Sequence, residues 1–226
     1  MSVRKDPDGR RSITVEIEVP GTPEQVWQAI ATGPGISSWF VPAQVEEQDG
    51  KPVAVTLQFG PGMLSRSVDW DGQLTGAEEG WPGIGRILQL YLAHFRGLHG
   101  TSMQFMTPVP GTPADAWAAL THASGVHDVT VGDYFTAPSG SPSFGGIVEY
   151  VSDHPFGALL RLDSPCPGLA ALGTIEFGDT VMATMTFYLY GDRADAVVAR
   201  ESPQWQTWLQ ERFPIPTGGE APAAPH

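Results

Sequence analysis

Apolar and polar residues alternate in several short stretches of the chain, and this period of two is typical of strands with one buried face. Residues 13–19 alternate Ile and Val with Thr and Glu. Residues 41–47 and 53–59 flank an Asp-Gly pair, which predicts a hairpin. In the second half, weaker alternation through Met103, Phe105 and Thr107 predicts another strand, and further strands are predicted at 146–152, 158–163 and 181–190.

Apolar residues at helical spacing predict a long closing helix in each half. The first helix is expected to begin at Trp81-Pro82 and the second to lie within 192–212, where Pro203 predicts a break or a helix start. Residues 65–79 are polar and without a period, so they predict a loop. The apolar stripes consist of Ile84, Ile87, Leu88, Tyr91, Leu92 and Phe95 in the first helix and of Trp205, Trp208 and Leu209 in the second.

The phrase Val-Pro-Gly-Thr-Pro occurs twice, at 19–23 and 109–113, with an offset of 90 positions (109 − 19 = 90). Trp27 is matched by Trp117 at the same offset. A fixed offset between matched residues indicates one supersecondary unit that is used twice. Each half is therefore expected to open with a strand, a tight turn and an amphipathic helix.

The helix after each phrase carries a clear start signal. Thr22 and Thr112 are suitable N-caps, a proline follows each, and a polar residue three positions later has capping-box spacing. That residue is Gln25 in the first copy and Asp115 in the second. The helix that follows the first phrase is expected to end near 33–35 and to bury Val26, Trp27 and Ile30.

The two halves differ in length. Trp81 lies 46 positions after Gly35 (81 − 35 = 46), whereas Trp205 lies 80 positions after Gly125 (205 − 125 = 80). Because a strand with its turn takes about 8–12 residues, the first half lacks about three strands. We therefore predict four segments: a disordered N-terminus at 1–11, a shortened unit at 12–99, a second unit at 100–213 and a disordered tail at 214–226.

Composition excludes some classes of partner. The chain has 226 residues, 41% of them hydrophobic, a net charge of −13 and a pI near 4.7. This acidity argues against nucleic-acid binding, which needs a basic surface. No apolar run is long enough to insert into a membrane, and the N-terminus lacks the apolar core of a signal peptide. With Cys166 as the single cysteine, a cytoplasmic protein is expected.

Candidate chemistry is sparse. His94 and His99 are five residues apart, as are His122 and His127, so neither pair shares a helix face and no metal site is predicted. Cys166 lies between two prolines without a cationic neighbour in sequence and is expected to be an unreactive thiol. No cofactor and no catalytic residue is assigned.

Part of the chain resembles a known superfamily. Residues 13–17, 23–30 and 36–40 resemble the opening of the START-like (SRPBCC) helix-grip superfamily, in the branch named after the activator of the Hsp-90 chaperone ATPase. Gly80-Trp81-Pro82, with Leu88, Leu92 and Phe95, resembles the closing helix of its bacterial members. The resemblance implies an α+β fold in which a curved antiparallel sheet wraps around a long C-terminal helix, here in two repeats with the first incomplete. Many members hold lipids, polyketides or other apolar molecules between sheet and helix.

The leading hypothesis is non-catalytic binding of an apolar small molecule, or a chaperone-associated role. One alternative is an enzyme of the polyketide cyclase or aromatase type. Another is a module that binds a protein partner, or a second copy, through an open sheet edge in the first half. The identity of the ligand stays open. The residues predicted to line a cavity are Trp39, Phe59, Tyr91, Phe95, Phe187, Tyr188, Trp205 and Trp208.

Overall fold

The computed structural model describes residues 2–5, 11–14, 16–48, 51–58, 64–67, 74–153, 156–177 and 180–214. The helices are α1 (Pro23–Ala31), α2 (Gly33–Ser37), α3 (Leu74–His94), α4 (Pro113–Ser124) and α5 (Ala194–Arg212). The strands are β1 (Ser2–Lys5), β2 (Arg11–Thr14), β3 (Ala43–Gln48), β4 (Lys51–Gln58), β5 (Leu64–Ser67), β6 (Gly100–Val109), β7 (Tyr134–Thr136), β8 (Gly145–Asp153), β9 (Phe156–Ser164), β10 (Gly168–Phe177) and β11 (Thr180–Tyr190).

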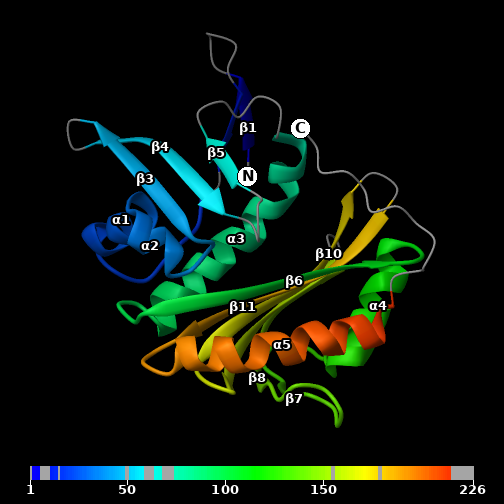
Figure 1. Cartoon of the computed structure of the whole chain (residues 1–226). Coiled ribbons are helices and arrows are strands. Elements are labelled where there is room, and N and C mark those ends of the chain that lie inside the picture. The colour runs from blue at the N-terminus through cyan, green and yellow to red at the C-terminus, as the bar shows by residue number, and fades with distance from the viewer. Residues whose placement is uncertain are drawn as a thin grey trace.

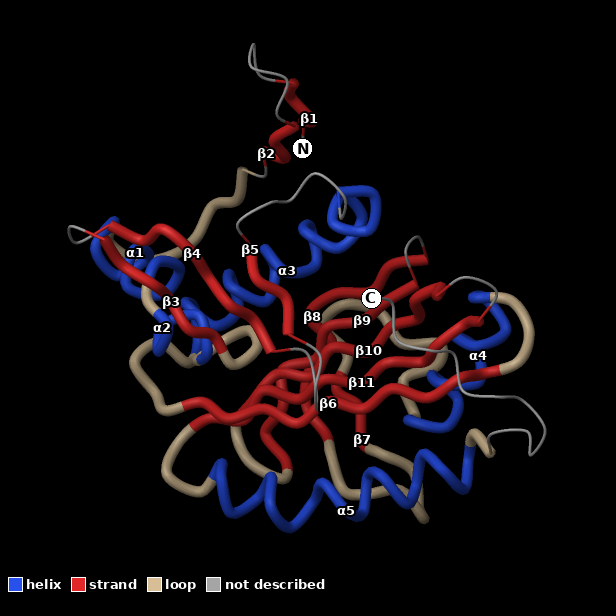
Figure 2. Tube along the Cα trace, turned by 45° about the horizontal axis from the view of Figure 1, so that its top comes forward, coloured by secondary structure: helices blue, strands red, loops and turns tan. Residues whose placement is uncertain are grey.

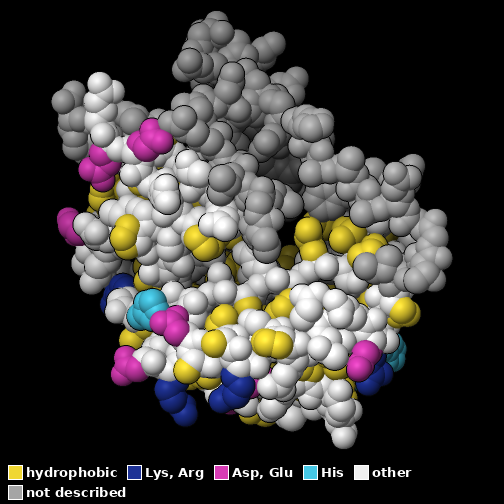
Figure 3. Space-filling model, in the orientation of Figure 1, with side chains coloured by type: hydrophobic (Ala, Val, Ile, Leu, Met, Phe, Trp, Pro, Cys, Tyr) yellow, Lys and Arg dark blue, Asp and Glu magenta, His cyan; other side chains and the backbone are white. Residues whose placement is uncertain are grey.

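The largest element of the fold is a six-stranded antiparallel sheet of order β6-β11-β10-β9-β8-β7. Helix α5 runs along one side of this sheet and α3 lies on the other (Figures 1 and 2). Charged side chains of both signs lie over α5 on the face seen in Figure 3, as expected for the outer face of an amphipathic helix. The α+β architecture predicted from the sequence is confirmed.

Strand β11 contributes to two separate cores. The strand was predicted at 181–190, and its alternate residues Val181, Ala183, Met185, Phe187 and Leu189 are buried in a cluster with α4 and α5. Tyr188 and Tyr190 project from the opposite face and are buried against α3. The first part of β11 alternates buried and partly buried residues, whereas 187–190 are buried on both faces and form a continuous apolar run.

The apolar stripe of α3 packs on a sheet, but on the sheet of the second half. Its predicted residues Ile87, Leu88, Tyr91, Leu92 and Phe95 are buried, and Ile84 packs against them. Their partners in the large sheet are Leu159 of β9, Leu169 of β10 and Tyr188 and Tyr190 of β11. A helix from the first half thereby covers the face of the large sheet that α5 leaves open.

The first half forms a smaller sheet of order β3-β4-β5. The predicted hairpin is confirmed as β3 and β4 within the described residues, and Phe59 lies outside them. Strand β5 was expected to be loop, because four residues in a polar segment carry no readable period. Three strands here against six in the large sheet agree with the predicted shortage, while the four-segment division remains a prediction.

The N-terminal prediction differs from the structure. Residues 2–5 pair with 11–14 as the hairpin β1-β2, in a stretch expected to be disordered. The strand predicted at 13–19 is wrong beyond Thr14, because residues 16–19 are not in a strand. They run beside α3 instead, where Gln89 Nε2 donates a 2.8 Å hydrogen bond to the carbonyl of Glu18. Alternation alone does not reveal whether a neighbouring strand exists to pair with.

Both capping boxes are confirmed, at Thr22 with Gln25 and at Thr112 with Asp115. The predicted burial of Trp27 and Ile30 is wrong, since these side chains are 57% and 43% exposed. Helix α1 buries Ala29 instead and packs there against α3. Its predicted face is exposed because the three-stranded sheet described in the first half does not cover it.

Three helix boundaries also differ from the prediction. Residues 33–35 open the short helix α2, which Thr32 caps by accepting a hydrogen bond from the amide of Gly35. Helix α3 begins at Leu74, so Trp81-Pro82 lies inside it. Helix α5 continues through Pro203. The buried residues Glu201 and Trp205 hold the backbone on both sides of this proline, so packing outweighs the lost hydrogen bond.

Strands β7 and β10 were not predicted, because neither has a regular alternation of apolar and polar positions.

In the described part of the chain, no helix combines the length and the apolar character that crossing a membrane requires.

Candidate functional site: an open groove beside α1, α2 and α3

An open groove of about 680 Å³ lies between α1, the start of α2 and the end of α3 that leads into β6. Figure 1 shows these elements side by side. The volume falls within the range of small-molecule sites. Helix α1 lines the groove with Glu24, Gln25, Gln28 and Ala29, and the end of α3 with its following turn contributes Tyr91, Leu92, Arg96, Leu98 and His99.

Close backbone contacts fix the walls of the groove. Trp39 Nε1 donates a 2.9 Å hydrogen bond to the carbonyl of Ala29, which ties the turn after α2 to α1. A Cβ on Gly35 would lie 1.9 Å from the carbonyl oxygen of Gln28, so only glycine fits between the two helices. A Cβ on Gly100 would lie 2.7 Å from the carbonyl oxygen of Ser38, which sets α2 directly against the start of β6.

The floor of the groove is apolar and buried. Ala29, Tyr91 and Leu92 are each at most 5% exposed. Behind them the rings of Phe95 and Tyr190 stack with their centroids 4.3 Å apart. The hydroxyl of Tyr190 is buried without a hydrogen-bond partner among the described residues. Burial, together with the nearby Tyr188 and Tyr91, holds the pKa of Tyr190 well above its ordinary value, so the phenol stays neutral.

The rim of the groove carries its charged groups. Arg96 Nη1 donates a 2.7 Å hydrogen bond to Gln25 Oε1. His99 Nε2 lies 3.2 Å from both carboxylate oxygens of Asp195. The backbone amide of Glu24 and the hydroxyl of Thr22 hold the pKa of the Glu24 carboxyl below its ordinary value. The rim thus combines one arginine, one carboxylate and one histidine that already has a partner.

The predicted cavity residues fall on opposite faces of the large sheet. Trp39, Tyr91, Phe95 and Tyr188 belong to the cluster beneath α3, and of these Tyr91 lines the groove. Phe187, Trp205 and Trp208 belong to the cluster between the sheet and α5. Phe59 lies outside the described residues. Phe187 and Tyr188 are neighbours in β11, so they necessarily point to different sides.

Aromatic rings fill the space between the large sheet and α5. Trp205 is fully buried, and its ring centroid lies 4.8 Å from that of Phe187, 5.1 Å from that of Phe144 and 5.3 Å from that of Trp208. Trp208 Nε1 is buried without a hydrogen-bond partner in the described part of the chain. The centre of the region to which the resemblance assigns a ligand is thus occupied by packed side chains, and a smaller groove of about 350 Å³ lies at its edge between β6 and α5.

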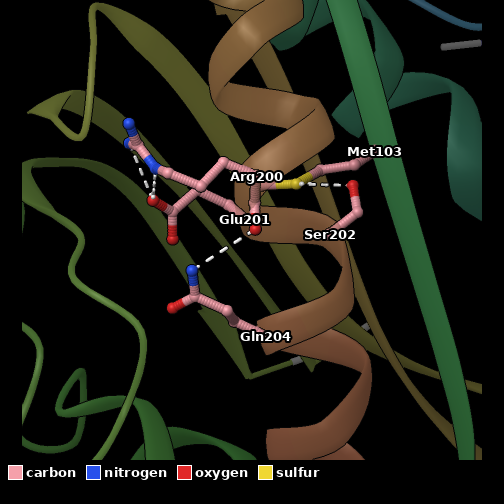
Figure 4. A network of polar contacts seen from close by, with 5 residues as sticks. All are labelled: Met103, Arg200, Glu201, Ser202 and Gln204. Carbon is pink, nitrogen blue, oxygen red and sulfur yellow. Dashed lines mark hydrogen bonds and ion pairs between the residues drawn. The ribbon is translucent and has the colours of Figure 1, made fainter.

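Glu201 is a buried carboxylate that was not predicted from the sequence. It lies on the buried stripe of α5 with Val197 and Trp205, and its Oε1 accepts hydrogen bonds of 2.8 Å from Arg200 Nε and Nη2. Figure 4 shows this ion pair on one side of α5 and the contact between Ser202 and Met103 on another. The regular spacing of 197, 201 and 205 is the signal that could have revealed Glu201. Arg200 balances its charge, so the pair serves as a structural ion pair.

The sequence analysis also missed the groove itself. Its rim contact joins residues 25 and 96, which are 71 positions apart, and the polar face of α1 gives the ordinary pattern of a solvated surface. Among the described residues, no cluster of three or more His, Cys, Asp or Glu side chains could hold a metal ion.

Several solved structures are similar to about half of this chain, at low sequence identity. The Aha1 dimer from Colwellia psychrerythraea matches with a TM-score of 0.39 and 11% identity, over 49% of this chain and 92% of that one. CalU16 from Micromonospora echinospora matches with a TM-score of 0.38 and 13% identity, over 55% and 78%. Norcoclaurine synthase from Thalictrum flavum matches with a TM-score of 0.37 and 9% identity, over 51% and 84%. No protein-family model and no curated protein matches the sequence.

The topology is the stronger observation. An antiparallel sheet formed by consecutive strands β7 to β11, completed by β6 beside β11, is closed by the long C-terminal helix α5, and the short helix α4 packs on the same face. Within 100–213 this is strand, helix, antiparallel meander and closing helix, in the order expected from the resemblance. The described residues thus confirm the α+β architecture with a six-stranded antiparallel sheet and a long C-terminal helix.

Proposed function

We propose that this protein binds a small, largely apolar molecule in the groove beside α1, α2 and α3 and does not transform it. One observation carries the proposal: the groove has a buried apolar floor of Ala29, Tyr91 and Leu92 and an exposed polar rim. An apolar molecule on this floor would lose its contact with water, and the rim would orient it.

The lining supports binding rather than catalysis. General acid–base catalysis works best when the pKa of the catalytic group lies near the working pH. Glu24 is held in its charged form by its own backbone amide and by Thr22, which makes it a weak base. His99 and its partner Asp195 are exposed, with side chains 62% and 70% accessible, so water surrounds this pair. The guanidinium of Arg96 stays charged at neutral pH, and the remaining polar side chains of the lining are amides and hydroxyls such as those of Gln28, Thr32 and Ser38. These groups hold a ligand without exchanging protons.

A neutral apolar fluorophore, N-phenyl-1-naphthylamine, tests the proposal on the full chain. Gln28→Trp should fill the groove, and Ala118→Trp is the matched control because Ala118 is the exposed residue at the equivalent position of α4. We expect saturable binding by the natural protein and the control, and at least about tenfold weaker binding by Gln28→Trp. Equal binding by all three proteins would place the dye elsewhere and refute the proposal.

Association through a sheet edge receives less support. Strand β3 lies at one end of its sheet, but it has a register shift between Glu46 and Glu47, and both side chains are exposed. Bulges and charges at a sheet edge oppose the addition of another strand. A chaperone-associated role remains a prediction from the sequence resemblance. It would rest on an exposed surface, so it predicts partner binding that the Gln28→Trp substitution leaves unchanged.

A further inference from the structure

We propose, on the basis of the function proposed above, that the ligand of the groove is an apolar monocarboxylate and that Arg96 binds its carboxylate. The guanidinium of Arg96 has N–H donors without a partner among the described residues. A guanidinium has five N–H donors, and that of Arg96 uses Nη1 for one side-chain hydrogen bond, to Gln25 Oε1. In the described part of the chain, no carboxylate lies within ion-pair distance of Arg96.

Some described arginines of this acidic chain have carboxylate partners and others do not. Arg161 pairs with Glu149, and Arg200 pairs with Glu201. Arg96 shares the lack of an acidic partner with other described arginines, but it is the arginine that lines the groove. The planar fork of a guanidinium matches a carboxylate with two parallel hydrogen bonds.

The repeat shows how the charge of Arg96 is kept available. In α4, the capping-box residue is Asp115, whose Oδ2 accepts a 2.9 Å hydrogen bond from the amide of Thr112. In α1, the equivalent residue is Gln25, whose Oε1 accepts a 2.9 Å bond from the amide of Thr22 and the bond from Arg96. A neutral amide holds the guanidinium in place without neutralising it, whereas an aspartate there would form an ion pair.

The backbone beside the capping box admits the guanidinium. Gly21 has a φ of +125°, and a Cβ at this position would lie 2.9 Å from Arg96 Nη1. The backbone angle favours glycine here, and the missing Cβ leaves room for the guanidinium. Arg96 is thus held over the start of α1, at the rim of the same groove whose floor is formed by Ala29 and Leu92.

The charges of the lining favour a single negative charge on the ligand. Arg96 supplies one positive charge, and Glu24 in the same lining supplies a negative one. A phosphate monoester carries close to two negative charges at neutral pH, so it would meet one cation and one repelling carboxylate. A carboxylate meets the same arginine with half that charge.

Displacement of N-phenyl-1-naphthylamine by three ligands with the same chain tests the inference: decanoate, decanol and decyl phosphate. With the natural protein we expect decanoate to displace the dye at a concentration at least about tenfold lower than decanol. The concentration ratio should fall to about one in Arg96→Gln and in Gln25→Asp. In Gln25→Asp the new aspartate can still cap α1, because Asp115 serves as the capping-box residue of α4. Asp115→Gln is the matched control and should keep the ratio of the natural protein.

Each outcome has one meaning. Equal displacement by decanoate and decanol overturns the carboxylate assignment, while the proposed binding function stands on the dye itself. Stronger displacement by decyl phosphate also overturns it, in favour of a dianion. A ratio that survives in both Arg96→Gln and Gln25→Asp overturns the role of Arg96. Failure of the dye to bind at all refutes the proposed function, which is a different result.

Discussion

Ile30 and Leu120 occupy the same position in the two copies of the repeated segment, yet Ile30 is 43% exposed and Leu120 is fully buried. Helix α4 contacts β9, β10 and β11 of the large sheet, and Leu120 belongs to the core cluster formed there. Helix α1 has the same cap and the same spacing, but it packs against α3 through Val26 and Ala29. The same sequence signal thus builds the same helix, and the surroundings decide which face becomes buried.

Truncation at these two equivalent positions should therefore have unequal effects. We expect Leu120→Ala to lower the free energy of unfolding by about 2–5 kcal/mol, through lost burial and a residual cavity. Ile30→Ala should cost less than about 1 kcal/mol, because much of its side chain already contacts water. Denaturant unfolding of both variants measures the difference. Equal costs would contradict the exposed position of Ile30.

The second prediction concerns the contribution of the contact between α3 and the large sheet to stability. Leu92 is buried against this sheet, so Leu92→Ala should lower the free energy of unfolding by about 2–5 kcal/mol. His94 is exposed two residues later, and His94→Ala should cost less than about 0.5 kcal/mol. Denaturant unfolding again measures both. A neutral Leu92→Ala would mean that α3 does not pack on the sheet.

The third prediction concerns the contribution of the buried Tyr190 hydroxyl to stability. Because it has no partner among the described residues, Tyr190→Phe removes a desolvated polar group and keeps the ring that stacks on Phe95. We expect the free energy of unfolding to stay unchanged or to rise by about 1 kcal/mol. A loss of more than about 1 kcal/mol would show that the hydroxyl is hydrogen-bonded in solution.

The two capping boxes should respond differently to pH. Hydrogen bonds from the backbone amide and then the hydroxyl of Thr112 hold the pKa of Asp115 below its ordinary value of 3.8. A carboxyl whose pKa is lowered by folding stabilises the protein above its unfolded pKa, and this contribution is lost as the pH falls through the folded pKa. The stability difference between the natural protein and Asp115→Asn should therefore be full above about pH 5 and shrink below about pH 4.

The matched variant for this test is Gln25→Ala in the first capping box. Because Gln25 does not titrate, its stability difference from the natural protein should not follow the titration of an aspartate. Thermal unfolding at several pH values measures both differences. A difference for Asp115→Asn that stays constant down to pH 2 would contradict the charged cap.

Local signals predicted the parts of the fold that depend on neighbouring residues. The capping boxes, the stripe of α3 and the alternating face of β11 are each determined within a few residues. The partner of a stripe is a long-range choice that no local pattern records. The stack of Phe95 on Tyr190 joins residues that are 95 positions apart (190 − 95 = 95).

The candidate site was less predictable than the fold. Aromatic residues were expected to line a cavity, but most of them fill the two cores, because large rings give the densest packing between a sheet and a helix. The groove instead uses the polar face of α1, which has the sequence pattern of any solvated helix. Only the juxtaposition of Gln25 and Arg96 gives that face a distinct chemistry.

The second face of the large sheet is covered by α3, a helix from the first half of the chain. Leu159, Leu169, Tyr188 and Tyr190 are dry because α3 lies over them. Residues 100–213 therefore need α3. If they were transferred alone into another protein, the sheet face that α3 covers would be an exposed apolar surface prone to aggregation. An evolutionary recombination or a designed fusion that moves this half must carry α3 with it or rewrite the residues that α3 covers.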